Sequence, residues 1–251
     1  MQYSYAIKYI DCLKNPSKIL EAPTSIKGNI LKALTCLSKY LGQYEEFRDK
    51  LKQHGIKWTK DSSYQSFIRI FNNNHNDLIE WYHKASNALN DNEKLYLKFM
   101  LLSGLRKNEG IQSFNLIIDL NKQNKLGEYF NIELSALEHF RYKQFLRNSK
   151  NVYISIIPKE LLSEMANSKP VSYSIIRKRL LKHGLKLRIK ELRSYFATYM
   201  AKHGLISEEV DLLQGRVGKS IFTKHYFKVN KDEFSKTVLN TIENLEKSVN
   251  I

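Results

Sequence analysis

Apolar residues recur at helical intervals in the N-terminal part of the chain. Over residues 26–40 they follow the three- and four-residue spacing of one helical face, which predicts a helix there. A second helix is expected over residues 43–54, because Gly55 suits the left-handed conformation that often ends a helix. Asn and Asp gather over residues 71–77, a composition that favours turns. The pattern therefore predicts a small helical domain over residues 1–72.

After this cluster the helical pattern resumes. Asp77 and Asp91 are suited to cap two successive helices. The second of these helices is expected over residues 92–103 and should end at Gly104. Because apolar residues occupy several of its faces, we expect that helix to be buried.

The middle of the chain contains patterns that favour strands. Residues 117–120 and 152–157 are expected to form strands, the second being rich in β-branched residues and ended by a proline. Residues 140–145 alternate apolar and polar side chains, and residues 147–151 suit a hairpin turn. From Tyr173 onward the pattern is helical again. These elements predict a mainly α fold with one small antiparallel β-sheet.

The charge of the chain indicates a polyanionic partner. The chain has 41 Lys and Arg against 25 Asp and Glu, a net charge of +16. Half of this excess lies in residues 177–202, which contain nine basic residues and a single acidic one. Such a concentration is typical of proteins that bind nucleic acid or an anionic membrane surface.

Several classes of protein do not fit the sequence. No uncharged apolar stretch approaches the length of about 18 residues that a membrane-spanning helix needs. The first residues, MQYSYAIKYIDCLK, lack the features of a secretory signal. The two cysteines, Cys12 and Cys36, form no metal-binding or disulfide pattern, and are expected to be small buried apolar residues. We therefore expect an intracellular protein.

The stretch LSGLRKNE contains the first candidate for chemistry, Arg106. It follows a glycine that ends one helix and stands where the next begins. A helix N-terminus offers free N–H groups, and an added guanidinium would make a phosphate site. The alternative is that Arg106 only pairs with an acidic neighbour such as Glu109.

Two further stretches carry basic candidates. In KELR, Lys190 and Arg193 are three residues apart and so share one helical face, although a solvated basic edge is the simpler interpretation. In LQGRVGKSIFTKHYF, Arg216 precedes Tyr226 by ten residues. A phenol with a pKa near 10 is a poor nucleophile unless cations surround it, and converging arginines would supply them. The neighbouring His225 is expected to be structural or to contact DNA.

In this order, SGLRKNE, KELR and LQGRVGKSIFTKHYF resemble the signature boxes of the tyrosine recombinases, the phage-type integrases. The family's second box usually begins with His, and its third usually carries His or Trp. Here those places hold Lys190 and Arg216, a pairing that is similar to integrases of archaeal spindle-shaped viruses and related plasmids. The resemblance covers roughly residues 75–230.

The resemblance implies a type IB mechanism for cleaving duplex DNA. Arg106 and Arg193 would hold the non-bridging oxygens of the scissile phosphate. Tyr226 would attack it, form a 3′-phosphotyrosyl bond and release a 5′-hydroxyl. Lys190 and Arg216 would orient the phosphate or manage the proton of the tyrosine. Because these are electrostatic and positioning tasks, no metal or nucleotide cofactor is implied.

The family also places a lysine on a β-hairpin as general acid for the departing 5′-oxygen. It lies in the turn before a strand that ends in proline, which favours Lys150, eight residues before Pro158, over Lys143. The interval from Arg106 to Lys150 is longer than the family's, which we interpret as an insertion around residues 121–139.

The resemblance further implies an assembly on DNA. Residues 1–72 would form a helical DNA-clamping domain, and residues 73–231 the tyrosine-recombinase catalytic domain. Residues 232–251 contain an amphipathic helix, which either packs on its own domain or docks on a neighbouring protomer. We expect double-stranded DNA as partner, self-association into a tetramer on it, and no membrane.

Two other functions fit parts of the same pattern. A type IB topoisomerase would share the chemistry but relax DNA without exchanging partners. Residues 173–193, two helical halves around Gly184, would also suit a helix-turn-helix in a non-enzymatic DNA-binding protein. In that case Lys190 and Arg193 would only contact DNA.

Overall fold

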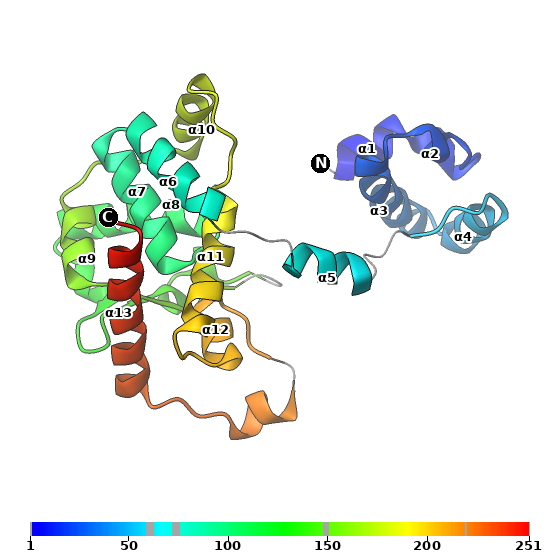
Figure 1. Ribbon diagram of the computed structural model, residues 1–251. Coiled ribbons are helices and arrows are strands. Elements are labelled where there is room, and N and C mark those ends of the chain that lie inside the picture. The colour runs from blue at the N-terminus through cyan, green and yellow to red at the C-terminus, as the bar shows by residue number, and fades with distance from the viewer. Residues whose placement is uncertain (1, 59–62, 72–75, 148–150, 219, 251) are drawn as a thin grey trace. The chain divides into compact units, whose positions relative to one another are not determined.

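The computed structural model describes the chain apart from residues 1, 59–62, 72–75, 148–150, 219 and 251. The chain divides into two compact units, residues 1–73 and 74–251, which are described separately. Its described part is mainly helical with one small antiparallel sheet, as the sequence predicts (Figure 1).

The first unit is entirely helical where it is described. Its elements are α1 (Gln2–Lys8), η1 (Ile10–Leu13), α2 (Lys18–Glu21), α3 (Thr24–Tyr40), α4 (Tyr44–Gln53) and α5 (Ser63–Phe71). The helices predicted over residues 26–40 and 43–54 are α3 and α4. Gly55 follows α4 with a φ of 63°, in the left-handed region that favours glycine. The core of this unit contains Ile30, Leu34 and Phe47, all almost fully buried.

The second unit surrounds a small sheet with helices. The helices are α6 (Asn76–Ala88), α7 (Asp91–Ser103), α8 (Lys107–Lys122), α9 (Lys159–Ala166), α10 (Tyr173–Lys182), α11 (Ile189–Lys202), α12 (Ser207–Leu213) and α13 (Lys231–Ser248). Helix α7 contacts α6, α8, α9, α11 and α13, so it is the buried helix that the sequence predicts. Asn90 caps it, one residue before the predicted Asp91, because the Asn90 side chain and Glu93 bond each other's backbone N–H.

The sheet has three short strands in the order β1–β2–β3, all antiparallel. They are β1 (Phe130–Asn131), β2 (Ala136–Glu138) and β3 (Ile154–Ile156). In the register, Leu137 of β2 lies opposite Phe130 on one side and Ser155 on the other. Strand β3 lies within the predicted strand 152–157.

Two predicted strands are wrong. Residues 117–120 lie inside α8, where Ile117, Ile118 and Leu120 continue the helical spacing begun by Phe114 and are buried. Residues 140–145 form parts of two 3₁₀ turns, η3 (His139–Arg141) and η4 (Lys143–Phe145). Their alternation does not mark a sheet face, because the ring of Phe145 stacks on Tyr129 in the core while Phe140 is 46% exposed. The predicted hairpin turn 147–151 includes residues outside the described part of the chain.

The C-terminal helix α13 packs on its own unit. Its apolar residues Phe234, Val238, Ile242 and Leu245 are buried in the core of residues 74–251. Glu246 pairs with Lys98 of α7, with 2.5 Å between Oε1 and Nζ. The apolar stripe is thus used within the unit, and docking of α13 on a neighbouring protomer stays a prediction that would require another face of the helix.

Candidate functional site

Arg106 stands at the junction of α7 and α8. Gly104 ends α7 with a φ of 61°, and a Cβ there would lie 2.3 Å from the ring of Phe196 in α11, so only glycine fits this junction. Arg106 is the N-cap residue of α8. Its Nη1 donates to Glu109 Oε1 at 2.6 Å and to the carbonyl of Asn151 at 3.3 Å. The predicted helix start is therefore present, and so is the pairing with Glu109.

Arg193 is buried on α11 and ties together two other segments. Its Nη1 donates to the carbonyl of Gly104 at 2.8 Å, and its Nη2 donates to the carbonyl of Gln214 at 2.7 Å. Gln214 returns a hydrogen bond from Nε2 to the carbonyl of Arg193 at 3.1 Å. Two of the five N–H groups of a guanidinium are used in this way. Its remaining N–H groups have no acceptor in the described part of the chain.

Arg216 follows α12 on a tight turn. Gly215 has a φ of 65°, and a Cβ on it would lie 2.1 Å from the carbonyl oxygen of Asn151. The backbone N–H of Arg216 donates to the carbonyl of Asp211 at 2.8 Å, and its guanidinium lies 3.6 Å from the Asp211 carboxylate. The Arg216 side chain is 60% exposed, so it is available to a ligand at the surface.

These contacts bring three arginines from distant parts of the chain into one region. Burial is the main cause that lowers the pKa of Arg193 from its usual value to about 10, and the nearby charge of Arg106 is the second cause. Arg216 acts in the same direction, while the carboxylates of Glu109 and Asp211 oppose the shift. Arg193 remains charged at neutral pH. A bound anion would relieve the repulsion, so the region is suited to a phosphate.

The structure adds contacts to this region that the sequence analysis did not predict. Glu109 is buried, and its Oε1 also accepts from Nη2 of Arg147 at 2.6 Å. The Asn151 side chain accepts from the backbone N–H of Arg147 at 2.6 Å. Nothing in the local sequence indicates the pairing of Glu109 with Arg147, because these residues lie far apart in the chain. Gln214, which holds Arg193, had no sequence signal either.

The candidate lysines differ in position. Lys190 is exposed on the first turn of α11, one turn before the buried Arg193. Lys143 is exposed in the turn η4. Lys150, the preferred hairpin lysine, lies outside the described residues.

Tyr226 lies on a π-helical turn, η5 (Phe222–Tyr226), in the connection between α12 and α13 (orange in Figure 1). The hydroxyl of Ser220, just before this turn, accepts from the N–H of Thr223 at 3.0 Å. Tyr226 is 70% exposed, and its neighbour His225 is exposed as well. No hydrogen bond joins Tyr226 to the three arginines among the described residues.

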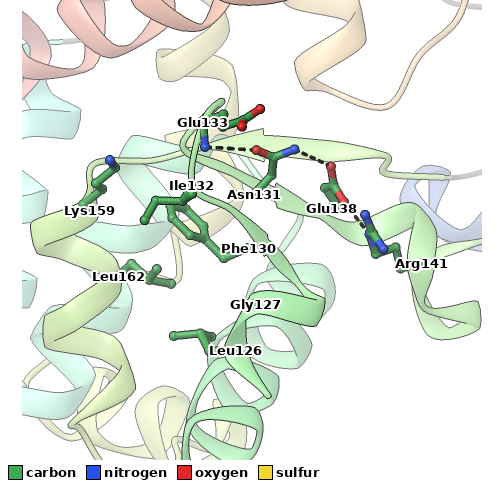
Figure 2. A pocket seen from close by; sticks show the side chains of 10 residues that line it. All are labelled: Leu126, Gly127, Phe130, Asn131, Ile132, Glu133, Glu138, Arg141, Lys159 and Leu162. Carbon is green, nitrogen blue, oxygen red and sulfur yellow. Dashed lines mark hydrogen bonds and ion pairs between the residues drawn. The ribbon is translucent and has the colours of Figure 1, made fainter. Parts of the chain in front are cut away.

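A cavity of about 630 Å³ lies elsewhere in the unit (Figure 2). It has an apolar floor that includes Phe130 and Leu162, and a polar rim in which Glu138 bonds Asn131 and Arg141. Of the predicted site residues that the structure describes, none lines it. A pocket of this volume is in any case unsuited to a duplex, whose phosphates are recognised along an exposed surface.

Comparison with known protein families identifies what this chain is similar to. Residues 70–240, more than half of the chain, match the archaeal phage integrase family. The chain belongs to this family. No curated protein and no solved structure matches it. The matched range contains Arg106, Arg193, Arg216 and Tyr226, and it confirms the resemblance to integrases of archaeal viruses.

Membership in the archaeal phage integrase family implies that the protein acts on DNA. The basic segment predicted to bind a polyanion agrees with that role, since six of its cations are exposed: Arg177, Lys178, Lys182, Lys186, Lys190 and Lys202. In the part of the integrase that the structure describes, no helix is long and apolar enough to cross a membrane. Across the same residues, no three His, Cys, Asp or Glu side chains are grouped as metal ligands.

Proposed function

We propose that this integrase is a site-specific DNA recombinase of the tyrosine type. Tyr226 attacks the scissile phosphate, so that a bond forms between phosphorus and the phenolic oxygen. The bond from phosphorus to the 5′-oxygen breaks, the phenol loses its proton, and the 5′-oxygen gains one. The 3′-phosphotyrosyl bond conserves the energy of the phosphodiester, and a 5′-hydroxyl from another strand then reverses the step.

The convergence of three arginines is the observation that carries this proposal. Arg106 and Arg193 each keep N–H groups that have no acceptor among the described residues, and these groups would bind the non-bridging phosphate oxygens. Guanidinium groups match phosphate oxygens in pairs, and fixed donors stabilise charge that develops in the transition state. Arg216, which is exposed, would complete the set from the other side of the phosphate.

The lysines have supporting roles in the proposal. Lys190 precedes Arg193 by one helical turn and would orient the phosphate or manage the proton of Tyr226. Lys150 would be the general acid that protonates the departing 5′-oxygen, with Lys143 as the alternative. Arg147 and Asn151, which flank the segment of Lys150, both contact the Arg106 and Glu109 pair, which supports a general acid in this loop.

The remaining parts would hold the duplex. Residues 1–72 would clamp DNA against the catalytic domain of residues 73–231, and the exposed cations of α10 and α11 would contact phosphates. Four subunits would assemble on two sites, as strand exchange requires two duplexes. Tyr226 must meet an arginine cluster on the bound phosphate, and this cluster belongs either to its own subunit or to a neighbour.

A covalent protein–DNA adduct tests the proposal directly. Wild-type protein incubated with a nicked suicide duplex of its target site should give a complex that resists denaturation, and Tyr226→Phe should give none. Arg193→Lys should bind DNA but cleave it on the order of 10²–10³-fold more slowly, because one amine cannot replace a two-pronged donor. An adduct with Tyr226→Phe, or none with wild type, contradicts the nucleophile assignment.

The competing functions separate in the same system. A topoisomerase would form the adduct and relax supercoiled DNA without joining strands of two sites. A helix-turn-helix binder would form no adduct. Against that last function, Arg193 is buried and bonded to two carbonyls, whereas a recognition residue projects from an exposed helix face. A mixture of Tyr226→Phe and Arg193→Gln proteins distinguishes shared from single-subunit active sites, since only shared sites regain cleavage.

A further inference from the structure

Two guanidinium groups share one carboxylate oxygen beside the proposed phosphate site. Nη1 of Arg106 and Nη2 of Arg147 each lie 2.6 Å from Oε1 of Glu109. The other oxygen, Oε2, accepts from the backbone N–H of Arg106 at 3.0 Å. The Glu109 side chain is 1% exposed, whereas those of Arg106 and Arg147 are 27% and 43% exposed. A buried anion is thus paired with two cations at the surface.

The buried position of Glu109 constrains what Arg106 can do. Removing one partner of a buried ion pair is strongly destabilising, because it leaves a buried charge without compensation. If Arg106 were the only partner of Glu109, turning its guanidinium toward a DNA phosphate would carry much of this cost. Because Arg147 bonds the same oxygen, Glu109 stays paired when Arg106 moves.

We propose that Arg147 is a positioning residue for DNA cleavage. It keeps Glu109 neutralised, and Arg106 is thereby free to give its guanidinium to the scissile phosphate. Glu109 still holds the backbone of Arg106 through Oε2, so the N-cap stays in place during this exchange. The inference rests on the proposed function, because it concerns how the Arg106 guanidinium reaches the phosphate that Tyr226 attacks.

A role through Glu109 differs from direct binding of DNA by Arg147. If Arg147 itself bound a phosphate, its loss would cost the same whether or not Glu109 carried a charge. It would also reduce the slope of log affinity against log salt by about 0.9, the contribution of one neutralised phosphate. If Arg147 acts through Glu109, its loss should change the cleavage rate and the salt slope only while Glu109 is charged.

A double-mutant cycle on the full-length protein makes this distinction. The variants are Arg147→Gln, Glu109→Gln and the double variant, with Arg147→Lys as a version that keeps the charge. Arg141→Gln is the matched control, because Arg141 also pairs with a buried glutamate, Glu138, and lines the cavity of Figure 2 instead of the arginine cluster. The readouts are the rate of adduct formation at saturating suicide duplex, the affinity for that duplex at several salt concentrations, and thermal unfolding.

The inference predicts that Arg147→Gln slows cleavage by about 10–100-fold, by analogy with the loss of residues that orient the ligands of metal sites. It further predicts nearly full recovery by Arg147→Lys, no added loss in the Glu109→Gln background, and wild-type cleavage by Arg141→Gln. An equal loss of cleavage in both backgrounds, a salt slope that also falls in the Glu109→Gln background, or no loss in either background overturns it. If wild-type protein forms no adduct, the proposed function itself fails. If wild-type protein forms the adduct but the double-mutant cycle shows no coupling between Arg147 and Glu109, only the role of Arg147 is contradicted.

Discussion

Arg193 and Gln214 exchange hydrogen bonds between α11 and the end of α12. The guanidinium of Arg193 donates to the carbonyl of Gln214, and the Gln214 side chain donates to the carbonyl of Arg193. Both residues are buried. This reciprocal pair fixes the position of an arginine whose remaining donors we assign to the scissile phosphate.

Shortening Gln214 should therefore affect cleavage more than DNA binding. Gln214→Ala leaves the buried carbonyl of Arg193 without its partner, which should destabilise the fold by about 1–3 kcal/mol. Displacement of Arg193 should slow cleavage by about tenfold or more, since small misplacements of reacting groups are costly. Urea unfolding and adduct formation at saturating duplex measure the two effects. Unchanged cleavage in a variant that unfolds more easily would mean that Gln214 does not position Arg193.

Glycine should be required at position 215 for two separate reasons. Gly215→Ala places a Cβ against the carbonyl of Asn151 and also strains a left-handed backbone, so a loss of about 2 kcal/mol or more is expected. Gly184→Ala is the matched control, because its φ is 69° but no atom lies within 4 Å of the added Cβ. The loss of stability in Gly184→Ala should stay at about 1 kcal/mol, the lower end of the cost of placing a non-glycine residue in the left-handed region. Equal losses of stability in the two variants, measured by urea unfolding, would show that the contact with Asn151 does not contribute.

The stability of the protein should fall in acid because of His139. This side chain is fully buried, bonds the Tyr129 hydroxyl at 2.6 Å and Ser155 Oγ at 2.8 Å, and burial lowers its pKa to about 3. The unfolded chain binds a proton below about pH 6.5, but the folded chain does not until about pH 3. His139 thus contributes stability that is complete above pH 6.5 and is lost as the pH falls toward 3, by about 1.4 kcal/mol per pH unit.

Urea unfolding at a series of pH values measures the slope of the unfolding free energy against pH. His139→Gln should reduce it by the contribution of one histidine, whereas His54→Gln, at an exposed position of the first unit, should leave it unchanged. A slope that persists in full without His139 would show that other groups cause the acid sensitivity.

The exposed cations of α10 should bind DNA phosphates without specifying sequence. Replacing Lys178 or Lys182 by Gln should reduce the slope of log affinity against log salt by about 0.9 for each phosphate that the variant no longer neutralises. Lys98→Gln should leave the slope unchanged, because Lys98 is occupied by Glu246 of α13. Fluorescence titration of a labelled duplex at several salt concentrations measures these slopes. Slopes that match wild type would place the bound DNA on another surface.

Much of the helical architecture could be predicted from the sequence, because it depends on local signals. Gly55 and Gly104 end helices as predicted, and the apolar stripe of α3 lies in the core. The wrong strands arise where tertiary packing decides. Residues 117–120 continue α8 because Phe114 and the apolar residues after it share one helical face, and residues 140–145 turn because the ring of Phe145 packs on Tyr129.

The arginines of the candidate site could be named from the sequence because each stands in a recognisable box. Apart from Glu109 beside Arg106, their partners could not be named in this way. Glu109 meets Arg147, and Arg193 meets Gln214, only after the chain has folded, and no local pattern encodes a contact between residues so far apart. The roles of Lys150, Lys190 and Tyr226 in catalysis stay predictions, as do the domain assignments and the tetramer.

The carbonyl of Asn151 contacts the guanidinium of Arg106 and lies close to Gly215, so one peptide group just before strand β3 joins two of the arginine segments. Basic side chains attract DNA even in an unfolded chain, but the cluster proposed to cut it exists only after these segments have met. A newly made or partly degraded chain could therefore hold DNA without breaking it, and the host genome would be exposed to cleavage only by completely folded protein.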